Sequence, residues 1–311
     1  MSPAPLRLAL VGAGRIGRVH TEALSRIHEV RLIGIADIHS ESAWNLADMA
    51  GCPAYSDVLE LVEREKPEAA IVCTPPHRHA EIAQELLGRG VHVLCEKPLA
   101  RDAEEAAAMV EAAERAGRHL VLATKYRYVP GVEIAKRLLD LGSLGEPRRA
   151  EINFSQRVSM AGHWYADPAI SGGGVLADNG PHAADLLRFL FGPVCEVRAT
   201  EGPRPQAVPV EQAVRLEARV GDGVEAEVQL SWNAEGGDTY LVVHGEEGTL
   251  EIGFKGCRCR PIQTSEWSPL APGYDRAQAF RLLHQSFART VRGEHDGADP
   301  AGDAFASVAV V

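Results

Sequence analysis

The sequence predicts an α/β protein of two domains: a doubly wound parallel sheet, then an α+β domain with a large, open, mostly antiparallel sheet. Three observations predict it. Over the first 124 residues, short and continuously apolar runs alternate with helical patterns. A glycine-rich turn joins the first apolar run to the first helical pattern. From about Glu146 onward, apolar residues recur at every second position, which is typical of strands with one buried face.

The first half alternates between predicted strands and predicted helices. Strands are expected over 6–14, 30–37, 69–76, 91–100 and 119–128, and helices over 15–27, 40–51, 79–90 and 102–117. The helix over 40–51 starts at a serine and ends at a glycine, as helix caps predict. Strands that are apolar throughout and separated by helices belong to parallel sheets covered on both faces. We therefore expect a first domain over residues 1–124.

The turn "VGAGRIG" places Gly12, Gly14 and Gly17 in G-x-G-x-x-G spacing between the first strand and the first helix. Such glycines permit a tight turn and let a pyrophosphate approach the N–H groups at the helix N-terminus. Asp37 ends the second strand 20 residues beyond Gly17, where a carboxylate can accept hydrogen bonds from the adenosine ribose. The alternative is that the glycines only form a turn and Asp37 caps the next helix. The coincidence of all these features favours a Rossmann dinucleotide-binding domain.

The same carboxylate indicates which dinucleotide is bound. Asp37 would repel a 2′-phosphate, and the next residues, Ile38, His39 and Ser40, include no Arg or Lys to hold one. We therefore expect NAD, with NADP less favoured.

The second half is expected to form one domain over residues 125–311. Strand-like alternation covers 148–158, 211–220, 224–232 and 239–252, and helical patterns cover 132–141, 171–192 and 279–293. The proline-rich segment 200–210 is predicted to be a loop. The sequence stops in "FASVAVV", an apolar helical run without a cap, which predicts a last helix that is cut short.

Composition excludes several classes of protein. The chain has 311 residues, of which 45% are hydrophobic and 24% charged, as in globular proteins. A net charge of -11 argues against a nonspecific grip on nucleic acid or anionic membranes. No apolar run approaches the roughly 18 residues that span a bilayer, and the first residues do not look like a secretory signal, so a cytoplasmic protein is expected. The six cysteines are scattered without the spacing of a zinc site, which predicts reduced structural thiols and no metal.

Three segments together resemble the Gfo/Idh/MocA oxidoreductases, a family that includes inositol dehydrogenases and glucose–fructose oxidoreductase. They are "VGAGRIG", "CTPPHRHAEIAQELLGRGVHVLCEKPLA" and "SGGGVLADNGPHAADLLRFLFG", and the likeness extends over essentially the whole chain. The E-K-P of Glu96, Lys97 and Pro98 and the glycine-led D-x-x-x-H of Asp178 and His182 are its most specific parts. The resemblance implies an active site between the two domains, a homo-oligomer (dimer or tetramer) built on the open sheet, and often a cis bond before the E-K-P proline.

The resemblance also implies site residues. Lys97, Asp178 and His182 match the family's catalytic lysine, aspartate and histidine, and His77 stands where many members have asparagine. With the glycine loop, the implied cofactor-binding set is Gly12, Gly14, Arg15, Ile16, Gly17, Asp37, Thr74, Pro75, His79, Glu96 and Lys97. Substrate contacts are implied around Tyr126, Arg127, Trp164, Tyr165 and Asn179, although aromatic residues in loops as often serve packing.

The three catalytic candidates suit alcohol oxidation. When a hydride leaves a secondary alcohol, its hydroxyl proton must also leave, and histidine is a suitable acceptor because its pKa lies near neutrality. Asp178 lies four residues before His182, so both project toward one face of a helix. Lys97 can stabilise the developing alkoxide. Pro181 implies a helix that either starts near Asn179 or starts at the glycines and bends; in either case the glycines are expected to let substrate come close.

Each of these residues also has an ordinary structural interpretation. Asp178 alone would be a helix cap, His182 an interior histidine and Lys97 a surface lysine. Their combination favours an NAD-dependent dehydrogenase or reductase acting on a sugar, an inositol or a related polyol. The alternative is a non-catalytic dinucleotide-binding regulator of the same fold. The substrate and the direction of the reaction are not specified by the sequence.

Overall fold

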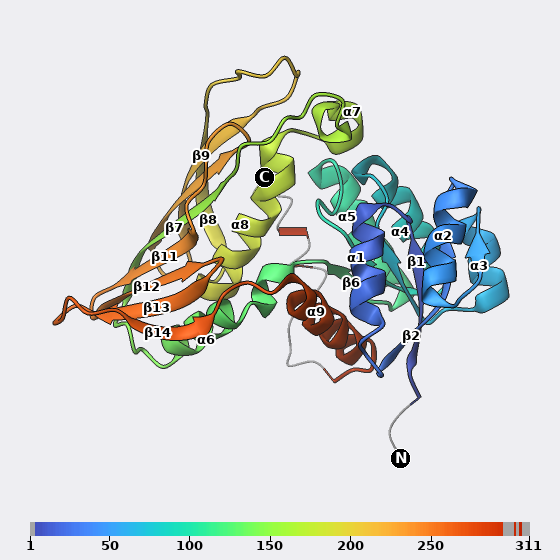
Figure 1. Cartoon of the computed structure of the whole chain (residues 1–311), viewed down its shortest axis with the longest axis horizontal. Helices are drawn as coiled ribbons and strands as arrows, with labels where there is room; N and C mark the ends of the chain where they lie inside the picture. The colour runs from blue at the N-terminus through green and yellow to red at the C-terminus, as the bar shows by residue number, and fades with distance from the viewer. Residues whose placement is uncertain (1–3, 295–301, 303–304, 307–311) are drawn as a thin grey trace. The chain divides into compact units, whose positions relative to one another are not determined.

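The computed structural model describes residues 4–294, 302 and 305–306, and it separates the chain into two units. The first unit runs to Thr124 and includes the helix α9 (Arg276–Val291), and the second covers Lys125–Asp275 (Figure 1). The expected assignment of all of 125–311 to the second domain does not hold for α9. This helix buries Phe280, Leu283 and Phe287 within the first unit, where it packs beside α1 (Arg15–Leu24).

The described part of the first unit contains a parallel six-stranded sheet in the order β3-β2-β1-β4-β5-β6. Its strands are β1 (Leu6–Val11), β2 (Val30–Ala36), β3 (Ala54–Tyr55), β4 (Ala69–Val72), β5 (His92–Cys95) and β6 (Leu120–Leu122). The helices between them are α2 (Ser40–Ala50), α3 (Val58–Glu65), the 3-10 turn η1 (Pro76–Arg78), α4 (His79–Gly88) and α5 (Ala103–Ala116). The predicted doubly wound fold is confirmed, and β3 and α3 are additions to it.

The sheet is covered on both faces, as its apolar strands require. On β1, Ala9 and Val11 face a core shared with α4 and α5, whereas the alternate residue Leu10 lies against α1 near Gly17. The strand order reverses at β1, and the helices that follow β1 and β4 lie on opposite faces of the sheet, which is the kind of switch point where open α/β sheets bind ligands.

Local chemistry sets the ends of the helices. Asp57 and Asp102 accept hydrogen bonds from backbone amides in the first turns of α3 and α5. Gly51 follows α2 in the left-handed conformation, which confirms the predicted glycine stop. The predicted strand over 119–128 is too long, because β6 ends at Leu122 and residues Lys125–Tyr128 form the 3-10 turn η2.

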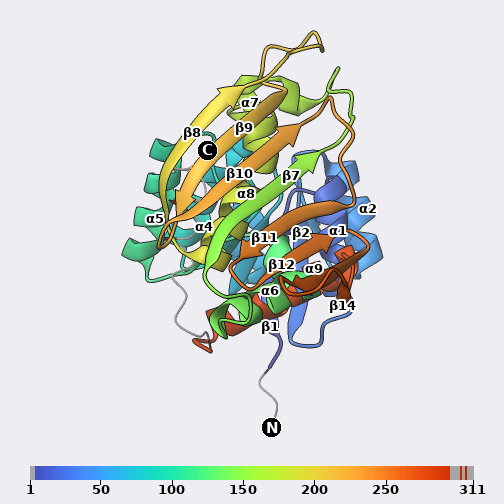
Figure 2. The same cartoon turned by 90° about the vertical axis from the view of Figure 1, so that its left-hand side faces the viewer.

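The second unit contains an eight-stranded sheet in the order β14-β13-β12-β11-β7-β10-β9-β8 among its described residues (Figure 2). The strands are β7 (Pro147–Ser155), β8 (Val194–Glu201), β9 (Ala213–Val220), β10 (Val224–Ser231), β11 (Thr239–Gly245), β12 (Gly248–Gly253), β13 (Gly256–Pro261) and β14 (Ser268–Pro272). Neighbours pair antiparallel except β7 and β10, which run parallel. The expected mostly antiparallel sheet is confirmed.

Within the described part of this unit, the helices α6 (Pro130–Asp140) and α8 (Val175–Phe191) cover one face of the sheet (Figure 1). Two short elements, η3 (Trp164–Ala166) and α7 (Pro168–Ser171), precede α8. The opposite face carries arginines and glutamates, including the ion pairs of Glu227 with Arg149 and Arg215. This face of the open sheet is the "outer face" below.

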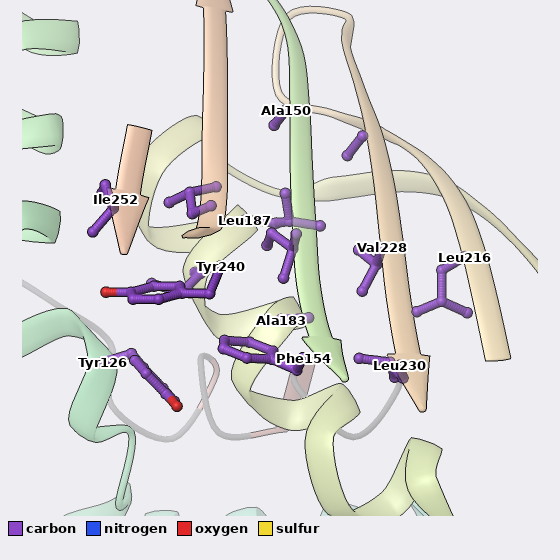
Figure 3. Packing of buried hydrophobic residues seen from close by; sticks show 14 of the residues in the cluster. Tyr126, Ala150, Phe154, Ala183, Leu187, Leu216, Val228, Leu230, Tyr240 and Ile252 are labelled. Carbon is purple, nitrogen blue, oxygen red and sulfur yellow. The ribbon is translucent and has the colours of Figure 1, made fainter. Parts of the chain in front are cut away.

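Beneath α8, the inward side chains of β7, β10 and β11 form the core of the unit. Figure 3 shows Phe154 of β7 and Tyr240 of β11 as neighbouring rings, with Tyr126 beside them and Ala183 of α8 next to Phe154. The Phe154 and Tyr240 rings stack with centroids 5.7 Å apart. The core therefore reaches Tyr126, which was expected at the substrate site.

Three other expectations concern the chain as a whole. All six cysteines are free, and burial raises the pKa of the Cys73 and Cys95 thiols well above the usual value. No helix among the described residues is long and apolar enough to cross a membrane. The expected helix over 305–311 lies outside the described residues, apart from Phe305 and Ala306.

Candidate functional site

The glycine turn of the first unit is shaped by close backbone approaches. Gly12 has a φ of +102°, and a Cβ on it would lie 2.7 Å from the backbone of Cys73. A Cβ on Gly17 would lie 2.2 Å from the Gly12 carbonyl oxygen. By contrast, no described atom lies within 4 Å of a Cβ placed on Gly14, the residue that precedes α1. Two of the glycines are therefore needed by the turn itself, and the third leaves the helix N-terminus open to a ligand.

Asp37 ties this turn to the end of β2. Its Oδ2 accepts a hydrogen bond of 2.7 Å from the Ala13 backbone N–H, and its Oδ1 accepts one of 2.8 Å from His39 N–H. Each carboxylate oxygen has a second lone pair with which it can accept a ribose hydroxyl. The neighbouring Ile38 is 83% exposed, so the surface beside Asp37 is apolar where a 2′-phosphate would need a cation. The Asp37 carboxylate and the open space at Gly14 therefore fit NAD.

The loop after β4 holds the predicted residues Thr74, Pro75 and His79. The His79 ring is buried, and its Nε2 and Nδ1 lie 2.7 Å from the Thr74 carbonyl oxygen and 2.8 Å from that of Pro98. Burial lowers the pKa of His79, and a neutral imidazole can donate to only one of these oxygens. His79 thus links the loop after β4 to the loop after β5, and its predicted place at the cofactor stays a prediction.

The E-K-P turn follows β5, and the bond between Lys97 and Pro98 is cis, as the resemblance implied. Glu96 is 6% exposed; its Oε2 accepts a hydrogen bond of 3.1 Å from the Lys97 backbone N–H, and its Oε1 lies 3.0 Å from His20 Nε2. The His20 Nδ1 in turn lies 2.7 Å from His284 Nε2. Sequence reasoning missed both histidines. His20 lies three residues beyond Gly17 on a buried helix face, but nothing in the sequence links it to His284.

In the second unit, α8 begins at Val175, so the helix starts at the glycines and contains Pro181. Glu211 caps it, because its Oε1 accepts hydrogen bonds from the Gly174 N–H at 2.7 Å and the Leu176 N–H at 3.0 Å. A Cβ on Gly174 would lie 2.0 Å from the Glu211 carbonyl oxygen. The expected reason for the glycines, close approach by substrate, therefore does not account for Gly174, which makes room for the Glu211 backbone.

The first turns of α8 carry Asp178 and His182, one helical turn apart. The Asp178 Oδ2 accepts a hydrogen bond of 3.1 Å from the indole N–H of Trp232, a fully buried residue just after β10. His182 is 6% exposed, and its ring meets that of Tyr126 edge-on, with centroids 5.0 Å apart. Both side chains are thus oriented by aromatic residues, of which Trp232 was missed because it lies 54 residues away in the sequence.

The residues expected around the substrate have structural partners. Asn179 donates to the Phe154 carbonyl oxygen at 3.3 Å, which anchors α8 to the sheet. Arg127 forms an ion pair with Asp185, whose side chain is 2% exposed, at 2.6 Å. Trp164 stacks on Tyr165 with centroids 3.9 Å apart. These contacts account for the positions of the side chains, and their predicted contact with substrate stays a prediction.

Comparisons with known proteins show which proteins the chain is similar to. Residues 6–124 match a family model described as "Oxidoreductase family, NAD-binding Rossmann fold", and residues 132–251 match the GFO/IDH/MocA C-terminal domain. The chain is 31% identical over 309 residues to inositol 2-dehydrogenase 4 of Saccharopolyspora erythraea, covering 96% of this chain and 89% of that protein. It is 34% identical over 189 residues to glucose-6-phosphate 3-dehydrogenase of Bacillus subtilis, but that match spans only 53% of the relative. Among solved structures, GenD2 from gentamicin A biosynthesis, in complex with NAD, superposes with a TM-score of 0.86 at 25% identity, over 99% of this chain and 92% of that one.

Proposed function

The chain belongs to the GFO/IDH/MocA oxidoreductase family, and we propose that it transfers a hydride between NAD and a secondary alcohol, or the corresponding ketone, of a sugar, inositol or related polyol. The observation that carries the proposal is the pair on α8, in which Asp178 is oriented by Trp232 and followed one turn later by His182. A helix cap would not need this arrangement, because Glu211 already caps α8.

The proposed cofactor site consists of the glycine turn, the N-terminus of α1 and Asp37, joined by the loops after β4 and β5. Bound NAD would supply a nicotinamide ring that accepts or donates the hydride. The Asp37 carboxylate and the apolar Ile38 beside it support a preference for NAD over NADP.

The chain's own residues would manage the proton and the charge. In the oxidation, His182 would take the proton from the hydroxyl oxygen while a hydride passes from the carbon that bears this hydroxyl to bound NAD, so a ketone forms. The Lys97 ammonium stabilises the alkoxide character that develops on the oxygen. Asp178 orients the imidazole, binds a substrate hydroxyl group or shares the proton transfer. We propose that these three side chains act on one substrate molecule, with further contacts from Tyr126, Arg127, Trp164, Tyr165 or Asn179.

A panel of sugars and inositols tests the function. Purified protein with NAD should produce NADH, followed by its absorbance, with at least one polyol, and His182→Ala should lose about 100-fold or more in kcat while still binding NADH. An exposed residue of the first unit that has no proposed role, changed as Arg64→Ala, is the control and should retain activity. Binding of NAD without turnover of any polyol or keto-sugar would instead support the non-catalytic regulator.

We also propose a cytoplasmic homo-oligomer. The outer face of the second unit alternates arginines and glutamates, and such a surface can be self-complementary when two copies meet about a two-fold axis. Light scattering coupled to gel filtration should give a mass of two or four times the 33.5 kDa of one chain. A monomer at micromolar concentration would contradict this proposal without affecting the enzymatic one.

A further inference from the structure

We propose that His20 and His284 are positioning residues for Lys97, acting through a buried chain of hydrogen bonds that ends on Glu96. This extends, and rests on, the proposed function, in which the Lys97 side chain acts on the substrate. Neither histidine was expected at the site from the sequence, and both belong to the unit that holds Lys97.

The chain joins three elements that are distant in sequence. Glu96 lies in the turn after β5, His20 on α1 and His284 on α9, and their exposed fractions are 6%, 0% and 1%. The distances are 3.0 Å from Glu96 Oε1 to His20 Nε2 and 2.7 Å from His20 Nδ1 to His284 Nε2. The Phe280 ring also contacts the His20 ring in a T-shaped arrangement, with ring centroids 4.9 Å apart. Water is excluded from the chain, so each polar atom depends on its protein partner.

The two ends of this hydrogen-bond chain fix the direction in which its members donate. An ionised carboxylate can only accept, so His20 carries a proton on Nε2 and donates it to Glu96. At the far end, His284 Nδ1 is buried and has no hydrogen-bond partner among the described residues. A buried donor without an acceptor is costly, so this nitrogen is best left unprotonated. His284 then carries its proton on Nε2 and donates it to His20 Nδ1.

The direction agrees with the electrostatics of His284. Burial, and then the proximity of His20, hold the pKa of His284 well below its usual value. The neutral imidazole of His284 on α9 therefore donates to His20 on α1, which donates in turn to the carboxylate of Glu96.

Lys97 is linked to the histidines by the second carboxylate oxygen of Glu96. Glu96 Oε2 accepts the Lys97 backbone N–H at 3.1 Å, so the orientation of the carboxylate sets where the lysine main chain sits. If His20 no longer donates, the buried Glu96 must rotate or take up another partner, and the turn moves with it. A displacement of about 1 Å at a catalytic group can lower the rate about 100-fold.

Kinetics of matched variants test the proposal. His20→Phe keeps a ring but removes the donor, and it should lower kcat about 100-fold with little change in the KM for NAD. His20→Gln can still donate to Glu96 and should recover most of that loss. His284→Leu leaves the His20–Glu96 contact in place and removes one neutral hydrogen bond, so its effect on kcat should be smaller, about tenfold or less. His92→Asn, at the opposite end of β5, is the control and should retain kcat.

Two measurements do not depend on turnover. Hydrogen exchange at the Lys97 amide should be faster in His20→Phe than in the wild type and should be restored in His20→Gln, with NADH fluorescence confirming that each variant still binds the dinucleotide. Nitrogen-15 NMR of labelled histidines should show both His20 and His284 protonated on Nε2.

The outcomes separate this proposal from the proposed function. Unchanged exchange at Lys97 in His20→Phe, a kcat loss that His20→Gln does not recover, or a proton on Nδ1 of His284 would each overturn the positioning role. Absence of polyol turnover in the wild type would overturn the proposed function. The hydrogen-bond chain would then have no role in catalysis, even if hydrogen exchange and NMR showed its bonds to be present.

Discussion

The indole N–H of Trp232 donates a hydrogen bond of 3.1 Å to Asp178 Oδ2. The tryptophan is fully buried and the aspartate is only partly so, which means that the fixed partner orients the accessible one. The Trp232 backbone N–H is itself held by the Gln212 carbonyl oxygen at 2.9 Å. Asp178 therefore has a defined direction before any substrate arrives.

Replacement of this tryptophan tests whether the direction matters. Trp232→Phe keeps an aromatic ring in the core but removes the only N–H of the side chain. We expect kcat to fall about tenfold, in line with about 1 kcal/mol for one neutral donor and somewhat more for a charged acceptor, with NADH affinity unchanged. Trp267→Phe is the control, because that ring lies under Arg258 at 4.4 Å, away from Asp178. Equal activity of Trp232→Phe and the wild type would show that Asp178 needs no such partner.

Two glycines of the turn, Gly14 and Gly17, should differ in their sensitivity to alanine. Gly17→Ala would force a Cβ to within 2.2 Å of the Gly12 carbonyl oxygen, and we expect it to lower the free energy of unfolding by about 1–3 kcal/mol. Gly14→Ala meets no described atom within 4 Å, so it should fold normally but weaken NADH binding, because its methyl group takes space where the pyrophosphate would lie. Thermal unfolding and NADH fluorescence measure the two effects. Gly88→Ala, also without a neighbour within 4 Å, should alter neither dinucleotide binding nor the turn.

Cofactor preference should follow the residues after β2. The double variant Asp37→Ser with Ile38→Arg keeps an oxygen that can accept from the Ala13 N–H, removes the charge that repels a 2′-phosphate, and adds a cation at an exposed position. We expect the ratio of kcat/KM for NADP over NAD to rise at least about tenfold, the effect of about 1.4 kcal/mol. Ile38→Arg alone serves as the control and should change the ratio less, since the carboxylate remains. No change in the ratio for the double variant would place cofactor selection elsewhere.

Stability should fall on mild acidification because of His92. Burial, followed by the positive charges of His119 and Arg118, lowers the pKa of His92 to about 4. Its Nδ1 accepts the His119 backbone N–H at 3.0 Å, a bond that requires the neutral ring. In the unfolded chain, His92 takes up a proton near pH 6.5. The contribution of neutral His92 to the free energy of unfolding is therefore fully present above pH 6.5 and is lost as the pH falls toward about 4.

The midpoint of thermal unfolding measured between pH 7 and pH 4.5 checks this prediction. His92→Asn can accept the same hydrogen bond through its side-chain oxygen and does not titrate, so its unfolding midpoint should fall less steeply than that of the wild type. His79 and His284, whose pKa values burial also lowers, should supply the slope that remains. An identical slope in His92→Asn would mean that His92 does not contribute.

The sequence predicts those parts of the fold and site that depend on local patterns. The turn of Gly12, Gly14 and Gly17 and the carboxylate of Asp37 lie where spacing placed them, because a strand, a tight turn and a helix leave few ways to connect. The switch from continuously apolar to alternating strands was also visible, since burial on one face or two sets the period of the pattern.

What the sequence could not predict are partners that meet only after folding. Trp232 reaches Asp178, Glu211 caps α8 and His284 reaches His20 across separations of 54, 35–37 and 264 residues. None of these pairs has a local signature, because a single hydrogen bond is compatible with many sequences. Arg127 is a similar case: the resemblance implied a substrate contact, and nothing in the sequence pointed to its buried partner Asp185, which lies 58 residues away.

The placement of α9 has a practical consequence for dissecting the protein. A fragment that ends at Thr124 would match the glycine-turn half of the sequence, yet it would strip Phe280, Leu283 and Phe287 from the surface they cover and leave the His20 ring facing water. Such a fragment should aggregate and express poorly. Recombinant work on the dinucleotide-binding half alone therefore needs the helix of residues 276–291 grafted back through a linker.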